Sequence, residues 1–231
     1  MQKFILWLMR KLFLLLIICP ALSIAQKPQD KNWGVSLTPA IIPMKGGHLG
    51  IQPGIEYKLY NRLSILTEVA FQTGKKNNAD STALDKKYLR IKPELRYSLS
   101  KKTHVFNSYI GLQFSYSFRS FRTEKYDYYY DHLPNDYVYY YDEAKINSPI
   151  ITTSFQIGSI ISDGKNFFMD MYIGLGARFI HTTYSELVNL NTGPWIRPFI
   201  GIKPFASYYY SGDLYRFHMN AGIRLIYRFH L

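Results

Sequence analysis

The pattern of hydrophobic and polar residues is most regular at the carboxyl end of the chain, over residues 214–231. Alternate positions there are apolar: Tyr215, Phe217, Met219, Ala221, Ile223, Leu225, Tyr227, Phe229 and Leu231. The positions between them are almost wholly polar, and include Arg216, Arg224 and Arg228. This period of two predicts a long β-strand with one apolar face and one polar face. Aromatic residues near both ends of the apolar face, with aliphatic residues between them, indicate that the apolar medium is lipid.

The same alternation recurs along the chain, in segments 33–42, 49–60, 63–72, 88–99, 105–121, 151–161 and 167–179. Short turns at 60–62, 99–103 and 162–166 alternate with longer polar loops at 74–87, 122–145 and 184–194. Consecutive strands joined in this way form antiparallel hairpins. Short turns on one side and long loops on the other are typical of outer-membrane barrels.

Residues 195–210 also alternate and would add a ninth strand, whereas bacterial outer-membrane barrels have an even number. Pro194, Pro198 and Pro204 make this segment a poor member of an interior ladder, so we assign it to an external hairpin arm. The predicted fold is therefore all-β, a transmembrane antiparallel up-and-down β-barrel of 8 strands, with 10 strands as the alternative. The last strand of a soluble sandwich or lipocalin-like barrel would show a similar pattern.

The amino terminus has the features of a secretory signal peptide. Lys3, Arg10 and Lys11 precede an apolar run at 12–22, and small residues lead to a cleavage site after Ala25. The prediction is a signal peptide at 1–25 and one outer-membrane β-barrel domain at 26–231. Because the only cysteine is Cys19, cleavage would leave no cysteine, which excludes a disulfide-stabilised exported domain.

The chain is basic, with a formal net charge of +12. In an exported chain without a basic helix or a basic tract, this charge favours anionic lipid headgroups or lipopolysaccharide as neighbours and argues against nucleic acid. No later segment approaches the roughly 20 apolar residues of a spanning helix, so any membrane residence must be by β-strands.

The charged residues of the alternating segments are predicted to face the barrel interior, since a central Arg or Lys in lipid costs about 2–4 kcal/mol. The interior of an eight-stranded barrel is barely wide enough for its own side chains, so these charges must pair. The candidates for lumen ion pairs are Glu56, Glu68, Glu94, Asp170, Arg90, Arg96, Arg178 and Arg224. Lys58, Lys92, Arg216 and Arg228 are expected in the same interior. We interpret the set as a structural plug; a conducting or gated pore is the alternative.

Tyrosines and carboxylates are concentrated in residues 122–145. Because a tyrosine ring is apolar with a polar tip, it suits membrane interfaces and binding surfaces alike. The segment is either an extension of the aromatic girdle or a recognition surface for a glycan, a peptide or a partner protein. The candidate binding residues in this extracellular loop are Tyr128, Tyr129, Tyr130, Asp131, Tyr139, Tyr140, Tyr141 and Asp142.

A catalytic interpretation depends on a polar group at the end of one predicted strand: His181, Thr182, Thr183, Ser185 and Glu186. Such residues could build a nucleophilic site, but their order and spacing match no barrel-enzyme motif, and a strand end entering a loop needs the same residue types. No metal-ligand spacing, glycine-rich phosphate loop or haem motif is present. We therefore predict no enzymatic activity, no metal and no cofactor.

The terminal strand resembles the carboxyl-terminal assembly signal of bacterial outer-membrane barrels. The matching positions are Leu231, Phe229, Tyr227, Leu225 and Ile223, although the family usually ends in Phe where this chain has Leu. As a whole, the chain resembles the small outer-membrane β-barrel proteins of the OmpA-transmembrane and OmpX-like type, without a periplasmic domain. The resemblance covers the mature chain as a pattern, with specific residues only at the signal peptide and the terminal strand.

This resemblance implies a non-enzymatic barrel in the outer membrane of a diderm bacterium, with a structural, adhesive or host-facing role. The expected partners are outer-membrane lipid and lipopolysaccharide, the outer-membrane assembly machinery, and an extracellular glycan or protein ligand. A lipid A-modifying barrel enzyme and a small-solute pore are the alternative functions.

Overall fold

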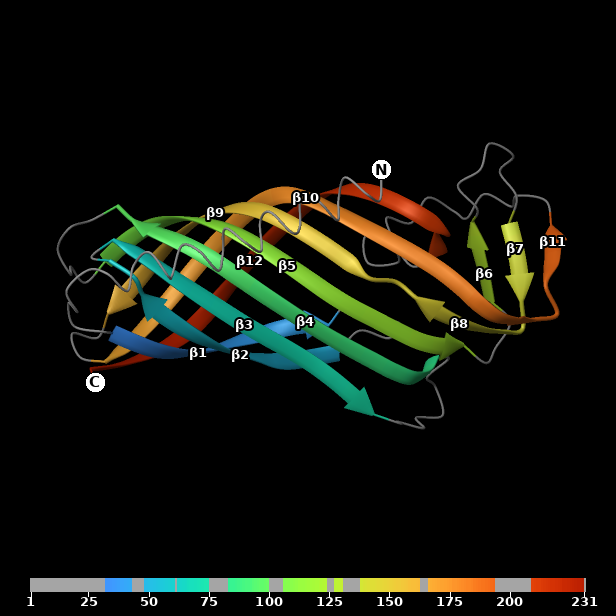
Figure 1. The fold of residues 1–231 in the computed structure, drawn as a ribbon, viewed down its shortest axis with the longest axis horizontal. Helices are drawn as coiled ribbons and strands as arrows, with labels where there is room; N and C mark the ends of the chain where they lie inside the picture. Colours follow the sequence, from blue (N-terminus) through green and yellow to red (C-terminus); the bar gives the residue numbers. More distant parts are fainter. Residues whose placement is uncertain are drawn as a thin grey trace.

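The computed structural model describes residues 32–42, 48–60, 62–74, 83–99, 106–123, 127–130, 138–162, 166–193 and 209–230, nearly all of them in antiparallel strands (Figure 1). The barrel wall consists of β1 (Asn32–Ile42), β2 (His48–Lys58), β3 (Leu63–Gly74), β4 (Ala83–Ser98), β5 (Phe106–Thr123), β8 (Glu143–Asn147), β9 (Ile150–Ser162), β10 (Phe167–Val188) and β12 (Gly212–His230). A separate small sheet contains β6 (Asp127–Tyr130), β7 (Val138–Tyr141) and β11 (Asn191–Gly193). The predicted signal peptide lies outside the described residues.

The wall closes into a ring of eight strand positions, because β8 and β9 share one position between β5 and β10. Pro149 separates the two, since proline has no N–H for the ladder. Backbone bonds from Ser148 N to Arg119 O (2.8 Å) and from His181 N to Pro149 O (3.2 Å) keep the interrupted strand in place. β12 then pairs with both β10 and β1 and completes the ring. The prediction of an eight-stranded antiparallel barrel is confirmed.

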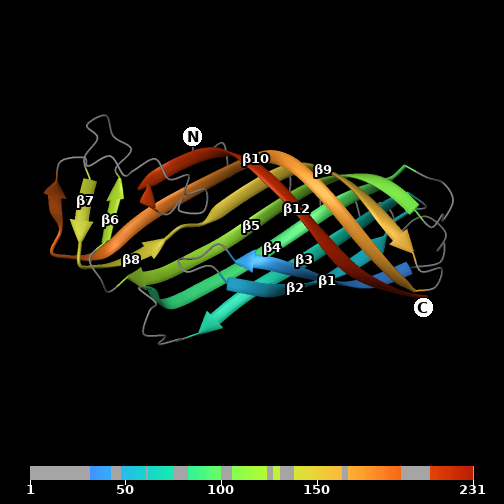
Figure 2. The same cartoon turned by 180° about the vertical axis from the view of Figure 1, so that it is seen from behind.

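The two ends of the barrel differ. At the end that we call the base, the first wall strand begins and the last one ends, and Asn32 lies opposite His230. At the other end, the mouth, β5 and β10 extend furthest and the small β6–β7–β11 sheet stands beyond the wall (Figures 1 and 2). The order of wall strands around the ring is the order of the chain, so each hairpin connects nearest neighbours.

The predicted long loops are shorter in the structure. Segment 122–145 contains β6, β7 and part of β8, segment 184–194 contains the end of β10 and β11, and segment 74–87 overlaps the first residues of β4. In segment 122–145 the alternation fails because a run of tyrosines has neither a clearly polar nor a clearly apolar face. Residues 194–208, which hold most of the predicted external arm, lie outside the described residues.

The outer face of the wall is apolar on every strand position, and the inner face is polar. Large side chains exposed on the outside include Leu37, Ile55, Phe71, Ile91, Leu112, Phe155, Ile173 and Leu225. Buried polar side chains on the inside include Gln52, Glu68, Arg96, Gln113, Gln156, Asp170 and Arg224. This arrangement is the reverse of that in a soluble domain. Within the described ranges, the structure contains no helix long and apolar enough to cross a membrane.

Candidate functional site in the lumen and at the mouth

Arg224 on β12 is at the centre of the lumen and is fully buried. Its guanidinium contacts three carboxylates from three other strands: Glu94 at 2.6 Å, Asp170 at 2.9 Å and Glu68 at 3.2 Å. The guanidinium carbon also lies 3.8 Å from the centre of the Tyr172 ring. A buried arginine can be accommodated in this way because its planar fork reaches several acceptors at once.

Arg96 on β4 extends the same group of charges. It contacts Glu94 and Asp170, each at 2.8 Å, and Glu56 at 3.5 Å. Tyr109 of β5 supports these contacts, because it donates its hydroxyl to Asp170 at 2.9 Å and its ring centre lies 4.9 Å from the Arg96 guanidinium. The buried charges of five strands, β2, β3, β4, β10 and β12, are thus joined directly to one another.

Two more cations complete the set. Arg228 binds both oxygens of Glu56, at 2.7 and 3.0 Å, and Lys92 forms an ion pair with Glu68, which also accepts a hydrogen bond from Thr38. The resulting group, which we call the ion network, holds the four carboxylates Glu56, Glu68, Glu94 and Asp170 and the four cations Lys92, Arg96, Arg224 and Arg228. Its formal charges balance, which suits a poorly solvated interior.

Of the predicted ion-pair candidates, Glu56, Glu68, Glu94, Asp170, Arg96 and Arg224 are in this network. Arg90 and Arg178 are not in this network, and neither forms an ion pair with a described residue. Arg90 donates instead to the side-chain oxygen of Gln52, and Arg178 lies directly opposite Arg216 on β12. The period of two assigns a side chain to the interior but does not specify which partner it meets there.

Interior residues follow the same succession along several strands, from the base to the mouth. On β12 the order is Arg228 and Arg224, then Asn220, then His218 and Arg216, then Leu214. On β9 and β5 the amides Gln156 and Gln113 are followed by the hydroxyls Thr152 and Ser115. Asn220 donates to Gln113 at 2.9 Å across the lumen, so the amides form a layer of their own. The lumen therefore contains, in order, the ion network, an amide layer, a basic layer and an apolar mouth.

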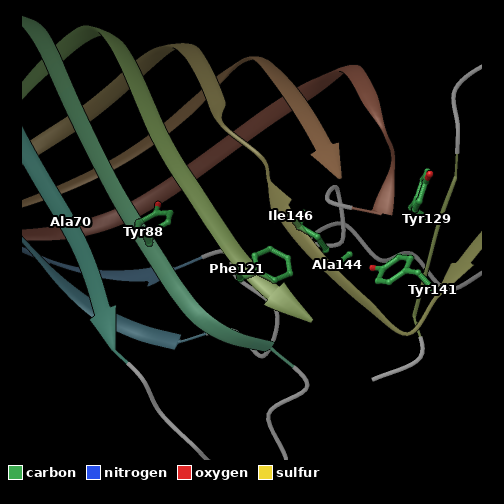
Figure 3. Close-up of a cluster of buried hydrophobic side chains, with 7 residues drawn as sticks. All are labelled: Ala70, Tyr88, Phe121, Tyr129, Tyr141, Ala144 and Ile146. Carbon is green, nitrogen blue, oxygen red and sulfur yellow. The ribbon is translucent and has the colours of Figure 1, made fainter. Parts of the chain in front are cut away.

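An apolar cluster that the sequence did not predict lies at the mouth. Interior side chains of the wall pack there with two tyrosines from the small sheet (Figure 3): Ala70, Tyr88, Phe121, Ala144 and Ile146 with Tyr129 and Tyr141. A second buried group contains Ile150, Ile180 and Leu214. The tyrosine-rich segment thus contributes to a core at the mouth and is not wholly a free surface.

Several of the candidate loop residues take part in this packing. Tyr129 is stacked on Tyr184 with ring centres 4.1 Å apart and on Tyr139 at 5.0 Å. Burial among these rings, together with Tyr141 and Asp127, raises the pKa of Tyr184 well above that of a free tyrosine.

The other candidates are more accessible or have structural partners. Tyr128 and Tyr140 are half-buried, and Tyr128 stacks on Tyr209 at 5.1 Å. Asp142 accepts a hydrogen bond from Asn189 at 2.7 Å, which ties β7 to the end of β10. The side chain of Tyr130 and the whole of Asp131 lie outside the described residues.

The structure divides the polar group at the end of β10 between two faces. Thr182 is buried and bonds with Ser148 at 2.8 Å, whereas His181 bonds with Asp213 at 2.5 Å on the other face. Ser185 donates to the backbone oxygen of Lys145, and Glu186 pairs with the Lys145 ammonium at 3.2 Å. Among the described residues, no group of histidine, cysteine and carboxylate side chains has the arrangement of a metal site.

The predicted assembly signal lies on the closing strand. Tyr227 pairs with Val35 and Phe229 pairs with Trp33 of β1, so both residues are where the last strand meets the first. Leu231 lies outside the described residues. Tyr227 also contacts Phe167 with ring centres 5.0 Å apart, and Trp33 contacts Tyr57 at 4.5 Å, which gives the base a belt of aromatic rings.

Comparisons with known proteins add little to this picture. No protein-family model matches the chain, and a search of curated proteins gave no match. Among solved structures, the chain is similar to a major outer membrane protein from Thermus thermophilus, with 10% sequence identity and a TM-score of 0.46, over 87% of this chain and 100% of that chain. A likeness of this degree supports no inference about function, so the barrel assignment depends on the strand pairing described above.

Proposed function

We propose that this chain is a non-enzymatic integral β-barrel of a bacterial outer membrane. Its lumen is closed by side chains, and its tyrosine-rich mouth faces the outside as a surface for interaction or envelope structure. The mouth is taken as extracellular because the longer connections are there, as in outer-membrane barrels generally. Lipid and lipopolysaccharide would surround the wall, and the assembly machinery would insert it through the terminal strand.

One observation carries the proposal: a continuous apolar outer surface around a charged interior. On β12, the outward residues from Tyr215 to Tyr227 are all apolar or aromatic. At roughly 3.4 Å per residue and a tilt of roughly 40°, this stretch covers about 30 Å along the barrel axis, which matches the hydrocarbon thickness of a bilayer. An aqueous protein could not leave such a band exposed without aggregating.

The ion network argues for a closed barrel and against a small-solute pore. Arg96, Arg224, Glu94 and Asp170 are all buried and bonded to one another across the lumen. An ion would have to break these contacts to pass. The arrangement of His181 and Ser185 offers no observation that favours the lipid-modifying enzyme.

The test combines membrane fractionation with conductance. The full chain, expressed with residues 1–25 in place, should sediment with the outer membrane, migrate faster on a gel before boiling than after it, and give no single-channel steps in a planar bilayer. Recovery in the soluble periplasmic fraction would refute membrane placement, and regular conductance steps would replace the closed barrel with a pore.

A further inference from the structure

Arg178 and Arg216 face each other inside the barrel without a carboxylate between them. They are directly opposite in the β10–β12 ladder, and both are on the inward-facing set of positions. Among the described residues, neither one is in an ion pair, and Arg178 Nε is buried without a hydrogen-bond partner. The Tyr210 ring centre lies 5.4 Å from the Arg216 guanidinium, but the ring carries no net charge. Two like charges in directly opposite positions of a sheet repel each other, so contacts among the described residues leave the pair unexplained.

The surroundings of this pair add positive charge. His218 is the next inward residue of β12 toward the base. The positive charges of Arg178, Arg90 and Lys92 are close enough to interact with its ring electrostatically. On the other side of Arg178, the ladder places the hydroxyl-bearing Thr152. We call Arg178, Arg216 and His218 the basic cluster.

The nearest described carboxylates do not neutralise this cluster. Those toward the base belong to the ion network, where four carboxylates already meet four cations. Toward the mouth, Asp213 is on the outer face and bonds to His181. Arg178, Arg216 and His218 are each partly buried, and cations held close together in a lumen are stabilised by a counter-charge. Paired guanidinium groups with adjacent hydroxyls are the donors that a phosphate group binds well.

On one side of the basic cluster, the wall has no strand pairing among the described residues. β12 pairs with β10 as far as Gly212, but it pairs with β1 only from His230 to Leu225. The ribbons of β1 and β12 diverge from that point toward the mouth (Figure 2). Arg216 and His218 are on the part of β12 beyond the last β1 pair. We call this line of separation the seam.

The hairpin formed by β1 and β2 also separates from β3. Its residues pair with each other up to Ile42 and His48, yet β2 pairs with β3 only from Gly54 to Lys58. Pro39 and Pro53 lie in the hairpin ladder in positions of the same type, opposite Ile51 and Leu37. Because the hairpin ladder continues through both prolines, their nitrogens face away from it and offer no donor to β12 or β3. The two prolines thus favour separation of the β1–β2 hairpin from β12 on one side and from β3 on the other.

The outer rim of the seam is apolar. Phe217 and Met219 of β12 are 67% and 63% exposed on the outer face, and Leu37 of β1, where the pairing with β12 ends, is 46% exposed. The seam therefore lies between an apolar outer surface and a basic interior, and only the thickness of the wall separates the two. A molecule with an anionic head and an apolar tail could place its head in the basic interior and its tail on the apolar outer surface.

We propose that the seam between β1 and β12 admits a phosphate-bearing amphiphile, whose phosphate is bound by Arg178, Arg216 and His218 and whose tail stays on the outer wall. This inference depends on the membrane placement proposed above. A membrane lipid and free phosphate share the recognising chemistry, and the apolar rim favours the lipid.

The test uses residues 26–231 folded in a non-ionic detergent and measures binding by calorimetry. The probes are dihexanoyl phosphatidic acid, dihexanoyl phosphatidylcholine and inorganic phosphate. Wild type should bind phosphatidic acid at least tenfold more tightly than either of the others. Equal affinity for inorganic phosphate would overturn the lipid assignment, and no binding of any anionic probe would overturn the site.

Variants locate the binding. Arg178→Gln combined with Arg216→Gln should weaken phosphatidic acid binding at least tenfold, whereas Arg62→Gln at the base, which removes a cation bonded to Tyr97, should not change it. Unchanged affinity in the double variant would overturn the proposal.

A second measurement does not depend on the ligand. Without any probe, Arg216→Gln should raise the urea midpoint of unfolding or leave it unchanged, because it relieves the repulsion from Arg178. A lower midpoint would mean that Arg216 has a structural partner, and would overturn the proposal. A folded, heat-modifiable barrel that binds no probe would refute this inference alone, whereas a chain that forms no barrel in detergent would refute the proposed function.

Discussion

Removal of the Glu94 carboxylate should destabilise the barrel strongly, because two buried arginines depend on it. Glu94 accepts from Arg96 Nε at 2.8 Å and from Arg224 Nη2 at 2.6 Å, and its side chain is 0% exposed. In Glu94→Ala, four cations of the network would face three carboxylates. Breaking a buried ion pair on one side costs about 3–5 kcal/mol, since the remaining charge is left uncompensated.

Two comparison variants separate charge from other effects. Glu94→Gln keeps most of the side-chain volume but removes the charge. It should therefore lower the free energy of unfolding by most of the amount expected for Glu94→Ala. Glu186→Ala removes a carboxylate bonded to Lys145 at 3.2 Å, but that carboxylate is 51% exposed. An exposed pair of this kind contributes only about 0–1 kcal/mol. The contrast between the two glutamates therefore measures the effect of burial in the lumen.

The assay is equilibrium urea unfolding of the refolded chain in lipid vesicles, followed by tryptophan fluorescence and checked by heat-modifiability. Comparable slopes against urea would show that all variants expose similar surface on unfolding. If Glu94→Ala lies within about 0.5 kcal/mol of wild type, the lumen is hydrated and the description of a dry ion network is wrong.

Two further predictions concern assembly and the mouth. Replacing Tyr227 and Phe229 together with Asp should leave the chain in the periplasm as a protease substrate, because both residues are on the strand that closes the barrel; normal outer-membrane levels on immunoblots would contradict this. Replacing residues 135–141 with a short Gly-Ser linker should leave a heat-modifiable barrel, since β7 pairs only with β6 and β11 among the described strands, but should abolish capture of the glycan or protein that intact cells bind. A shortened chain that cannot fold would show that the small sheet is needed for the wall.

The face of each residue in the wall could be predicted from the sequence, because a strand has a strict period of two. Glu68, Arg96 and Arg224 were placed in the interior for that reason alone. The partners could not be predicted in this way. Arg224 and Glu68 are 156 positions apart, and their contact depends on how far neighbouring strands are staggered around the ring. Arg90 and Arg178 show the same limit, since each faces inward but neither meets a carboxylate among the described residues.

The small sheet at the mouth was missed for a different reason. Tyr128, Tyr129 and Tyr130 follow one another, and so do Tyr139, Tyr140 and Tyr141. Tyrosine occurs on buried faces and on solvent-exposed faces, because its ring is apolar and its hydroxyl is polar. A run of tyrosines therefore shows no alternation of polar and apolar residues from which a strand could be predicted. Pairing of β6 with β7, and burial of Tyr129 and Tyr141, became visible only in the structure.

The ion network connects strands across the two places where the backbone ladder of the wall is short. The ladders on either side of the β1–β2 hairpin are the short ones, since β1 meets β12 only as far as Leu37 and β2 meets β3 only as far as Gly54. The network spans these same lines: Arg228 of β12 binds Glu56 of β2, and Arg224 of β12 binds Glu68 of β3.

Thr38 of β1 adds a third connection across these lines, because it donates to Glu68 of β3. Side-chain contacts inside the lumen therefore replace backbone hydrogen bonds that the prolines prevent. They hold the base of the hairpin in the wall, beyond which β1 has no described pairing with β12. The buried charges thus secure the wall next to the two lines along which its backbone pairing stops.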